Sequence, residues 1–364
     1  MTNFFQMHIY HKYLYKAVFL QFIAVLATLT GIVWITQSMR IVDLIVNKGI
    51  NFLDFLKITM LLVPYLVFII IPVALFFSGI SVAYKFLLDK EMIILKSIGL
   101  SDFQIAKPFL NLAILIVGLS YIISCYVLPL SYGKFKDLQV YFRNNYASIL
   151  LEEGVFSSQV NKLTLYVDKK IDEKTYGGIV VYDNREVNNP KVVFAKEGKI
   201  FKTQNNSWFE LYNGSHQEKN ISGDGLSVLY FDKYSINFSL FEEDYIRTIE
   251  PNEKYITELF DISPDEESKR NKLISHGHFR LSWPLNSLAL MMLATSMLIT
   301  NSYQRKEGVY RNLVVGILGI GFIILSILFN NFTLHNLNFA VLMYLAPIVL
   351  MIFALIRFKG ANNL

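Results

Sequence analysis

The stretch LYKAVFLQFIAVLATLTGIVWIT, residues 14–36, decides the class of this 364-residue protein. As a helix rising about 1.5 Å per residue, it is long enough to cross about 30 Å of hydrocarbon. No small-residue cleavage motif follows it, so we interpret it as a membrane span and not as a signal peptide. The whole composition agrees, because only 17% of the residues are charged and 53% are hydrophobic, whereas an average soluble domain has about 25% charged residues.

Five more apolar stretches predict further spans. Residues 55–84 contain Pro64 and Pro72, which favour a bent helix because each removes a backbone hydrogen bond. Residues 108–129 begin and end with a proline, which predicts a helix bounded by Pro108 and Pro129. The remaining spans are expected at 281–300, 312–332 and 337–357. The sequence therefore predicts six transmembrane helices, three before and three after a large insert.

The short loops predict the orientation. Basic residues gather on the side that would hold both termini, and that side is cytoplasmic by the positive-inside rule. They are Lys12, Lys16, Lys85, Lys90, Lys96, Lys107, Arg305, Lys306, Arg311, Arg357 and Lys359. We expect a multi-pass membrane protein with both termini cytoplasmic and the insert extracytoplasmic.

The insert reads as an all-β domain. Short β-rich runs such as GGIVVYDN and KVVFAKEGKIF are separated by turn residues such as Asn213-Gly214. Even spacing without intervening helices favours an antiparallel sandwich or jelly roll. Ser263-Pro264-Asp265-Glu266 is typical of a helix start, so a helix is expected at about 264–278. We expect three domains: helices in 1–129, the β domain in 130–279, and helices in 280–364.

The sequence contains no motif for catalysis of its own. GxxxxGK[ST], HExxH, GxSxG and CxxC are all missing, so no nucleotide hydrolysis is expected within this chain. Cys125 is the only cysteine, which excludes an intrachain disulfide. The histidine pairs have no third ligand beside them, and Glu242-Glu243-Asp244 lacks the spacing of a calcium loop. We expect neither a metal nor a cofactor.

Two features point to function. The loop KFLLDKEMIILKSIGLSDFQIAK, residues 85–107, alternates apolar and charged residues at helical spacing, which predicts an amphipathic helix over 86–99. Such a helix could lie on the membrane surface or dock a cytoplasmic partner. Arg40, at the outer end of the first span, could either extend its charge to the interface or face a cavity that holds an anionic group.

These residues resemble the LptF/LptG family of permease subunits of the bacterial lipopolysaccharide export ABC transporter. The matching segments are WITQSMRIVDLIVNKG (34–49), IIIPVALF in the second span, DKEMIILKSIGLS (89–101), the insert from GVFSSQVNKLTLYVDKK, and FRLSWPLNSLALMMLA at the fourth span. The resemblance covers essentially the whole chain, and the F-type subunit fits better than the G-type.

The resemblance implies a non-catalytic permease of the bacterial inner membrane, with the β domain in the periplasm. Such a permease extracts lipopolysaccharide from this membrane and passes it to a periplasmic jelly-roll bridge. Its implied partners are a cytoplasmic ATPase dimer (LptB-type), a second, LptG-type permease and an LptC-type jelly-roll protein. The loop would be the coupling helix that docks on the ATPase, through Asp89, Glu91, Met92, Ile93, Leu95, Ile98 and Gly99.

The first and fifth spans would form lateral gates, with Trp34, Gln37 and Arg40 toward the substrate cavity. Some F-type members carry lysine where this chain has Gln37, which leaves the number of cations on this side open. The alternative is a permease that moves a periplasmic domain without passing substrate through the membrane. Such permeases usually carry four spans with the insert after the first, whereas this insert follows the third.

Overall fold

The computed structural model describes residues 2–46, 51–145, 153–160, 163–172, 175–184, 190–202, 207–219, 225–237, 249–261, 269–300 and 307–361. The chain divides into two compact units. A helical unit comprises Met1–Ile41, Leu56–Lys136 and Ile249–Leu364, and a second unit comprises Val42–Phe55 and Asp137–Thr248. Helices run through both of the expected domain boundaries, 129/130 and 279/280.

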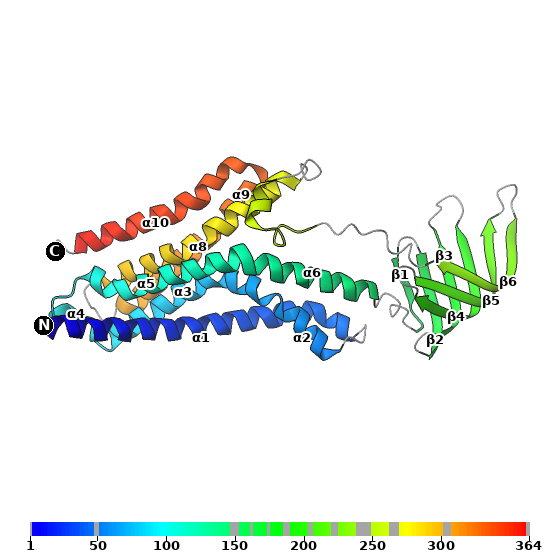
Figure 1. The fold of residues 1–364 in the computed structure, drawn as a ribbon, viewed down its shortest axis with the longest axis horizontal. Coiled ribbons are helices and arrows are strands. Elements are labelled where there is room, and N and C mark those ends of the chain that lie inside the picture. The colour runs from blue at the N-terminus through cyan, green and yellow to red at the C-terminus, as the bar shows by residue number, and fades with distance from the viewer. Residues whose placement is uncertain are drawn as a thin grey trace. The chain divides into compact units, whose positions relative to one another are not determined.

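Within the described residues, six helical segments are long and apolar enough to cross a membrane, which confirms the six-span prediction. The long helices are α1 (Thr2–Val46), α3 (Val63–Leu88), α5 (Asp102–Ile122) with η1 (Ile123–Val127) and α6 (Leu128–Asn145), α8 (Arg270–Ile299), α9 (Glu307–His335), and η5 (Leu337–Phe339) with α10 (Ala340–Ala361). The short helices are α2 (Phe52–Met60), α4 (Glu91–Ser97) and α7 (Ile256–Phe260). In the helical unit, α4 lies at the end where α1 begins and α10 finishes (Figure 1).

The prolines act differently from the sequence expectation. The expected span 55–84 is divided at Leu61 and Leu62, and α3 begins just before Pro64, where a missing N–H costs nothing. The prolines expected to bound the third span do not end it, since Pro108 lies inside α5 and the helix continues past Pro129 to Asn145. The N-cap predicted at 263–266 lies outside the described residues, whereas α8 runs unbroken from Arg270 into the fourth span.

The core of the helical unit is built around α8 and α3. α8 is the most buried of the six spans, and α1 and α9 are the least buried. Close packing depends on small residues: a Cβ on Gly79 of α3 would lie 2.6 Å from the sulfur of Met291 on α8. A Cβ on Gly319 of α9 would lie 2.1 Å from the ring of Phe76. Backbones approach closely at such positions because no side chain separates them.

The described part of the second unit contains six strands, which confirms the all-β insert, and we call this unit the β unit. They are β1 (Phe156–Val160), β2 (Leu163–Asp172), β3 (Thr175–Asp183), β4 (Lys191–Lys202), β5 (Ser207–Lys219) and β6 (Leu226–Asn237). All neighbours are antiparallel, and the strands follow one another in chain order within a single sheet. The described strands therefore form an up-and-down sheet and not two packed sheets with crossing connections.

A line of unpaired positions crosses this sheet from β2 to β6. Register pairs are formed on both sides of it but skip one residue on each strand. The skipped residues are Asp168, Gly178, Lys196, Asn213 and Asp232. Two of them, Gly178 and Asn213, have positive φ angles of 64° and 52°, the conformation that glycine and asparagine adopt most readily. We call these five residues the crease.

The crease shifts the alternation of buried residues. On β3, Tyr176 and Ile179 are both buried in the same cluster although three positions separate them. Regular strands place alternate residues on opposite faces, so an odd separation requires one residue outside the regular pleat. Gly178 is that residue, and on β6 Phe231 and Tyr234, also three positions apart, both pack against the same cluster. The sheet can therefore bend while one apolar face continues across it.

Candidate functional site

The amphipathic loop forms a shorter helix than the sequence suggested. Instead of one helix over 86–99, α3 extends to Leu88 and a separate helix, α4, runs from Glu91 to Ser97. The chain reverses before α4 at Lys90, where φ is 60°, and after it at Gly99, where φ is 85°. Both positions are left-handed, the conformation that ends a helix sharply. Gly99 is the residue that follows the cap of α4 at Ile98.

The apolar side chains of this loop face two directions. Met92 is buried against the bundle core and Leu95 packs partly against it. Ile93, Ile94 and Ile98 are exposed, with Ile98 at 70%. The residues predicted to dock therefore do not share one face, because Met92 and Leu95 face inward, whereas Ile93 and Ile98 are exposed together with Ile94, which was not among them. The helix α4 is too short for helical periodicity alone to show which of its faces is exposed.

Two acidic residues lie where α4 begins. Asp89 is exposed and Glu91 is half-buried in the first turn of α4. The Tyr13 hydroxyl of α1 donates to Glu91 Oε1 over 3.5 Å, and the Tyr13 ring packs edge-on against Phe86. Glu91 therefore lies beside the first turns of the first span. This contact was not visible in the sequence because 78 positions separate the two residues.

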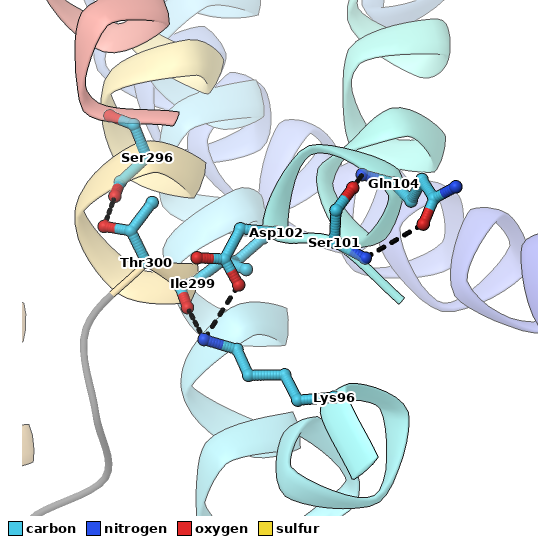
Figure 2. A network of polar contacts seen from close by, with 7 residues as sticks. All are labelled: Lys96, Ser101, Asp102, Gln104, Ser296, Ile299 and Thr300. Carbon is cyan, nitrogen blue, oxygen red and sulfur yellow. Dashed lines mark hydrogen bonds and ion pairs between the residues drawn. The ribbon is translucent and has the colours of Figure 1, made fainter. Parts of the chain in front are cut away.

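Lys96 joins α4 to two other helices (Figure 2). Its Nζ donates to the Ile299 carbonyl at 2.7 Å and lies 2.8 Å from Asp102 Oδ1. Ile299 is the last residue of α8, and Asp102 is the first residue of α5. Ser101 caps α5 through a reciprocal pair of bonds with Gln104. In the sequence Lys96 belongs to the charged pattern of the loop and to the basic residues of the cytoplasmic side, and neither pattern predicts this contact.

The three residues expected at the outer end of α1 have different surroundings. Trp34 is half-buried, and its Nε1 donates to the Thr59 carbonyl of α2 at 3.1 Å. Gln37 is half-buried, whereas Arg40 is exposed. Trp34 therefore joins α1 to α2. Arg40 is the exposed residue of the three, so its charge can meet a group outside the protein.

A buried arginine holds the opposite end of the bundle. Arg280 of α8 is 1% exposed; its Nη1 donates to the Lys254 carbonyl at 2.6 Å and its Nη2 to the Ser124 carbonyl. In the π-helical segment the Leu128 N–H donates to Ile123. The next residue, Pro129, has no N–H to offer Ser124. Arg280 thus supplies the donor that the proline removes.

The segment that returns from the insert is fixed beside this arginine. Glu250 accepts from the Tyr132 hydroxyl at 2.9 Å, and its Oε1 lies 2.7 Å from Lys136 Nζ. Partial burial would raise the Glu250 pKa, but the bonds from Lys136 and Tyr132 outweigh it and lower the pKa below its ordinary value. Further along, the ring of Phe260 fills the space that a Cβ on Gly277 would occupy. We call residues 249–261 the return segment.

The β unit carries its own cavity, of about 830 Å³, along the crease. Its lining combines the crease residues Asp168, Lys196 and Asp232 with the aromatic side chains of Tyr166, Phe194 and Tyr230. On the face opposite the buried cluster, Glu210 lies 2.9 Å from Lys233 and accepts from Tyr212, and these bonds lower the pKa of Glu210 and raise that of Lys233. Within the described ranges, no three His, Cys, Asp or Glu side chains cluster closely enough to hold a metal.

Comparison with known proteins gives the same family over nearly the whole chain. Residues 12–360 match the family described as the lipopolysaccharide export system permease LptF/LptG. An uncharacterised protein of Rickettsia prowazekii (strain Madrid E), RP871, is 34% identical over 338 residues, which cover 92% of this chain and 93% of that protein.

Proposed function

The chain belongs to the LptF/LptG family of lipopolysaccharide export permeases, and we propose that it is the F-type transmembrane subunit of an ABC exporter. In this role it would extract lipopolysaccharide from the inner membrane and deliver it to a periplasmic bridge. The observation that carries the proposal is α4, a short helix with exposed isoleucines between the second and third spans. The family match by itself names no surface for an ATPase, whereas the exposed face of α4 offers one.

The ATPase is a separate cytoplasmic dimer in this proposal, since the chain has no nucleotide-binding motif. The end of the bundle that holds α4 and both chain ends is then cytoplasmic, as the distribution of basic residues indicates. Ile93, Ile94 and Ile98 form the apolar docking face and Glu91 the acidic contact. A carboxylate that pairs with a basic residue in a partly buried groove can fix the helix and let it move with its partner.

Lipid enters between the loosely packed spans. α1 and α9, the first and fifth spans, are the least buried of the six, which suits helices that separate to admit a lipid sideways. The second permease subunit, of LptG type, would complete the cavity on this side. Arg40 at the outer end of α1 then meets a lipid phosphate, for which the guanidinium offers two parallel donors.

The β unit receives the lipid in the final step. β6 has β5 as its one neighbour in the described sheet and exposes Leu226, Val228, Leu229 and Tyr230. An edge strand with unpaired backbone groups can add a strand from another protein. We assign β6 as the edge that meets the LptC-type jelly-roll protein.

Depletion of the protein in its own host tests this function. We expect lipopolysaccharide to accumulate in the inner-membrane fraction, and the native gene to restore export. Arg40→Glu should assemble normally yet restore export poorly, because a carboxylate repels the lipid phosphate. Arg40→Lys is the matched control that keeps the charge. Normal lipopolysaccharide distribution after depletion would refute the function, and full rescue by Arg40→Glu would leave Arg40 as an interfacial anchor.

A further inference from the structure

The contacts of Lys96 suggest how α4 is held, an inference that rests on the proposed docking role of α4. A seven-residue helix is too short to be stable alone. Left-handed residues, Lys90 and Gly99, flank it and interrupt the helical path on both sides. Its apolar contact with the bundle consists of Met92 and the half-buried Leu95. These features would let α4 rotate about its two turns when a partner pushes it.

Lys96 opposes that freedom by joining three helix ends. The Ile299 carbonyl belongs to the last turn of α8, whose carbonyls have no partner within the helix. A cation is favourable at this end, and a carboxylate such as Asp102 is favourable at the start of α5. Asp102 is buried, and the Lys96 side chain is 35% exposed. The ammonium has three donors, so it can bind both acceptors at once.

The identity of the helix that Lys96 holds gives the contact its importance. α8 is the most buried span, and it packs against α3 through Met291 at Gly79 and through the Trp283 Nε1 bond to the Phe68 carbonyl. A tightly packed helix moves as a unit with its neighbours. Displacement of its cytoplasmic end would therefore reach the centre of the bundle, whereas displacement of α4 alone would be absorbed at Lys90 and Gly99.

We propose that Lys96 is a positioning residue that locks the docking helix α4 to the end of α8 and the start of α5. Movement that the ATPase imposes on α4 is then delivered to the central helix of the permease. Without the ammonium, α4 still presents Ile93, Ile94 and Ile98 to the ATPase, but its movement is only loosely connected to the bundle.

Two measurements on the full chain test the lock. In the first, hydrogen exchange of residues 91–98 is followed in the purified protein. Lys96→Met keeps the apolar stem and removes the ammonium, so α4 should exchange faster by roughly 2- to 5-fold, the effect of one partly exposed ion pair. Lys96→Arg should keep most of the protection. Lys107→Met is the matched control, because it removes an exposed lysine of α5.

In the second, lipopolysaccharide released per ATP hydrolysed is measured for the assembled exporter. Lys96→Met should lower this ratio, Lys96→Arg should restore most of it, and Lys107→Met should leave it unchanged. Unchanged exchange in α4, or an unchanged ratio, would overturn the proposal. If the native chain bound no ATPase, the proposed function itself would fail and the lock would lose its role, even if the exchange of α4 still responded to Lys96→Met.

Discussion

The two ends of the helical unit are each held by one cation, but in different ways. Lys96 is partly exposed, is paired with Asp102, and holds α4 between two left-handed turns. Arg280 is buried, and among the described residues it binds two backbone carbonyls without forming an ion pair with a carboxylate. A partly exposed ion pair contributes little to stability and can be broken and remade, whereas a buried cation without its acceptors is very unfavourable. One end can therefore move, and the other is fixed.

The fixed end gives the largest expected effect. Arg280→Met removes the Arg280 donor from the carbonyl of the buried residue Ser124 and should lower the free energy of unfolding by about 2 kcal/mol. The free energy of unfolding of Arg280→Lys should lie between those of the native protein and Arg280→Met, since an ammonium can still donate but lacks the two arms of the guanidinium. Thermal unfolding midpoints in detergent should be highest for the native protein, lower for Arg280→Lys and lowest for Arg280→Met.

Pro129 offers a specific control for the same contact. Pro129→Ala restores an N–H near Ser124 and should make the loss of Arg280 less costly, so the two changes should not be additive. A change of about 1 kcal/mol in stability shifts the midpoint by a few degrees. An Arg280→Met midpoint within about one degree of the native value would therefore contradict the view that this end is fixed.

The attachment of the return segment gives a smaller effect. Glu250→Gln should destabilise the protein by only about 0.5 kcal/mol, because the Glu250 side chain is 41% exposed and water screens its pair with Lys136. Limited proteolysis near residues 249–261 measures whether the segment loosens. Tyr132→Phe, which removes one of the two partners, should have a still weaker effect.

The pH dependence of this attachment has a definite sign. The pKa of Glu250 is lowered in the folded protein, so its stabilisation is complete above the unfolded value of about 4.3. It is lost as the pH falls below that value through the lowered folded pKa. Proteolysis of the native return segment should therefore increase only in acid, and Glu250→Gln should abolish that increase. An equal increase in both proteins would refute the assignment.

The sequence predicts the features that depend on local residues, but not those that depend on contacts between residues distant in the chain. Apolar length alone predicted six spans, and turn residues predicted an all-β insert, because both signals are local. The helix breaks were predicted poorly: Pro129 is accommodated in a helix that widens at Ile123–Val127, with Arg280 supplying a donor from 156 positions away. The inward side of Met92, the exposure of Ile94 and the crease likewise depend on neighbours distant in sequence.

Co-purification tests most directly whether this chain is an exporter subunit that docks an ATPase through α4. The tagged native chain should be extracted in mild detergent from its own host and its partners identified by mass spectrometry. We expect an ABC-type ATPase and a second six-span permease with the native chain. Glu91→Arg should insert in the membrane but lose the ATPase, while Lys107→Met retains it. Recovery of neither partner with the native chain, or full recovery of the ATPase with Glu91→Arg, would contradict the account.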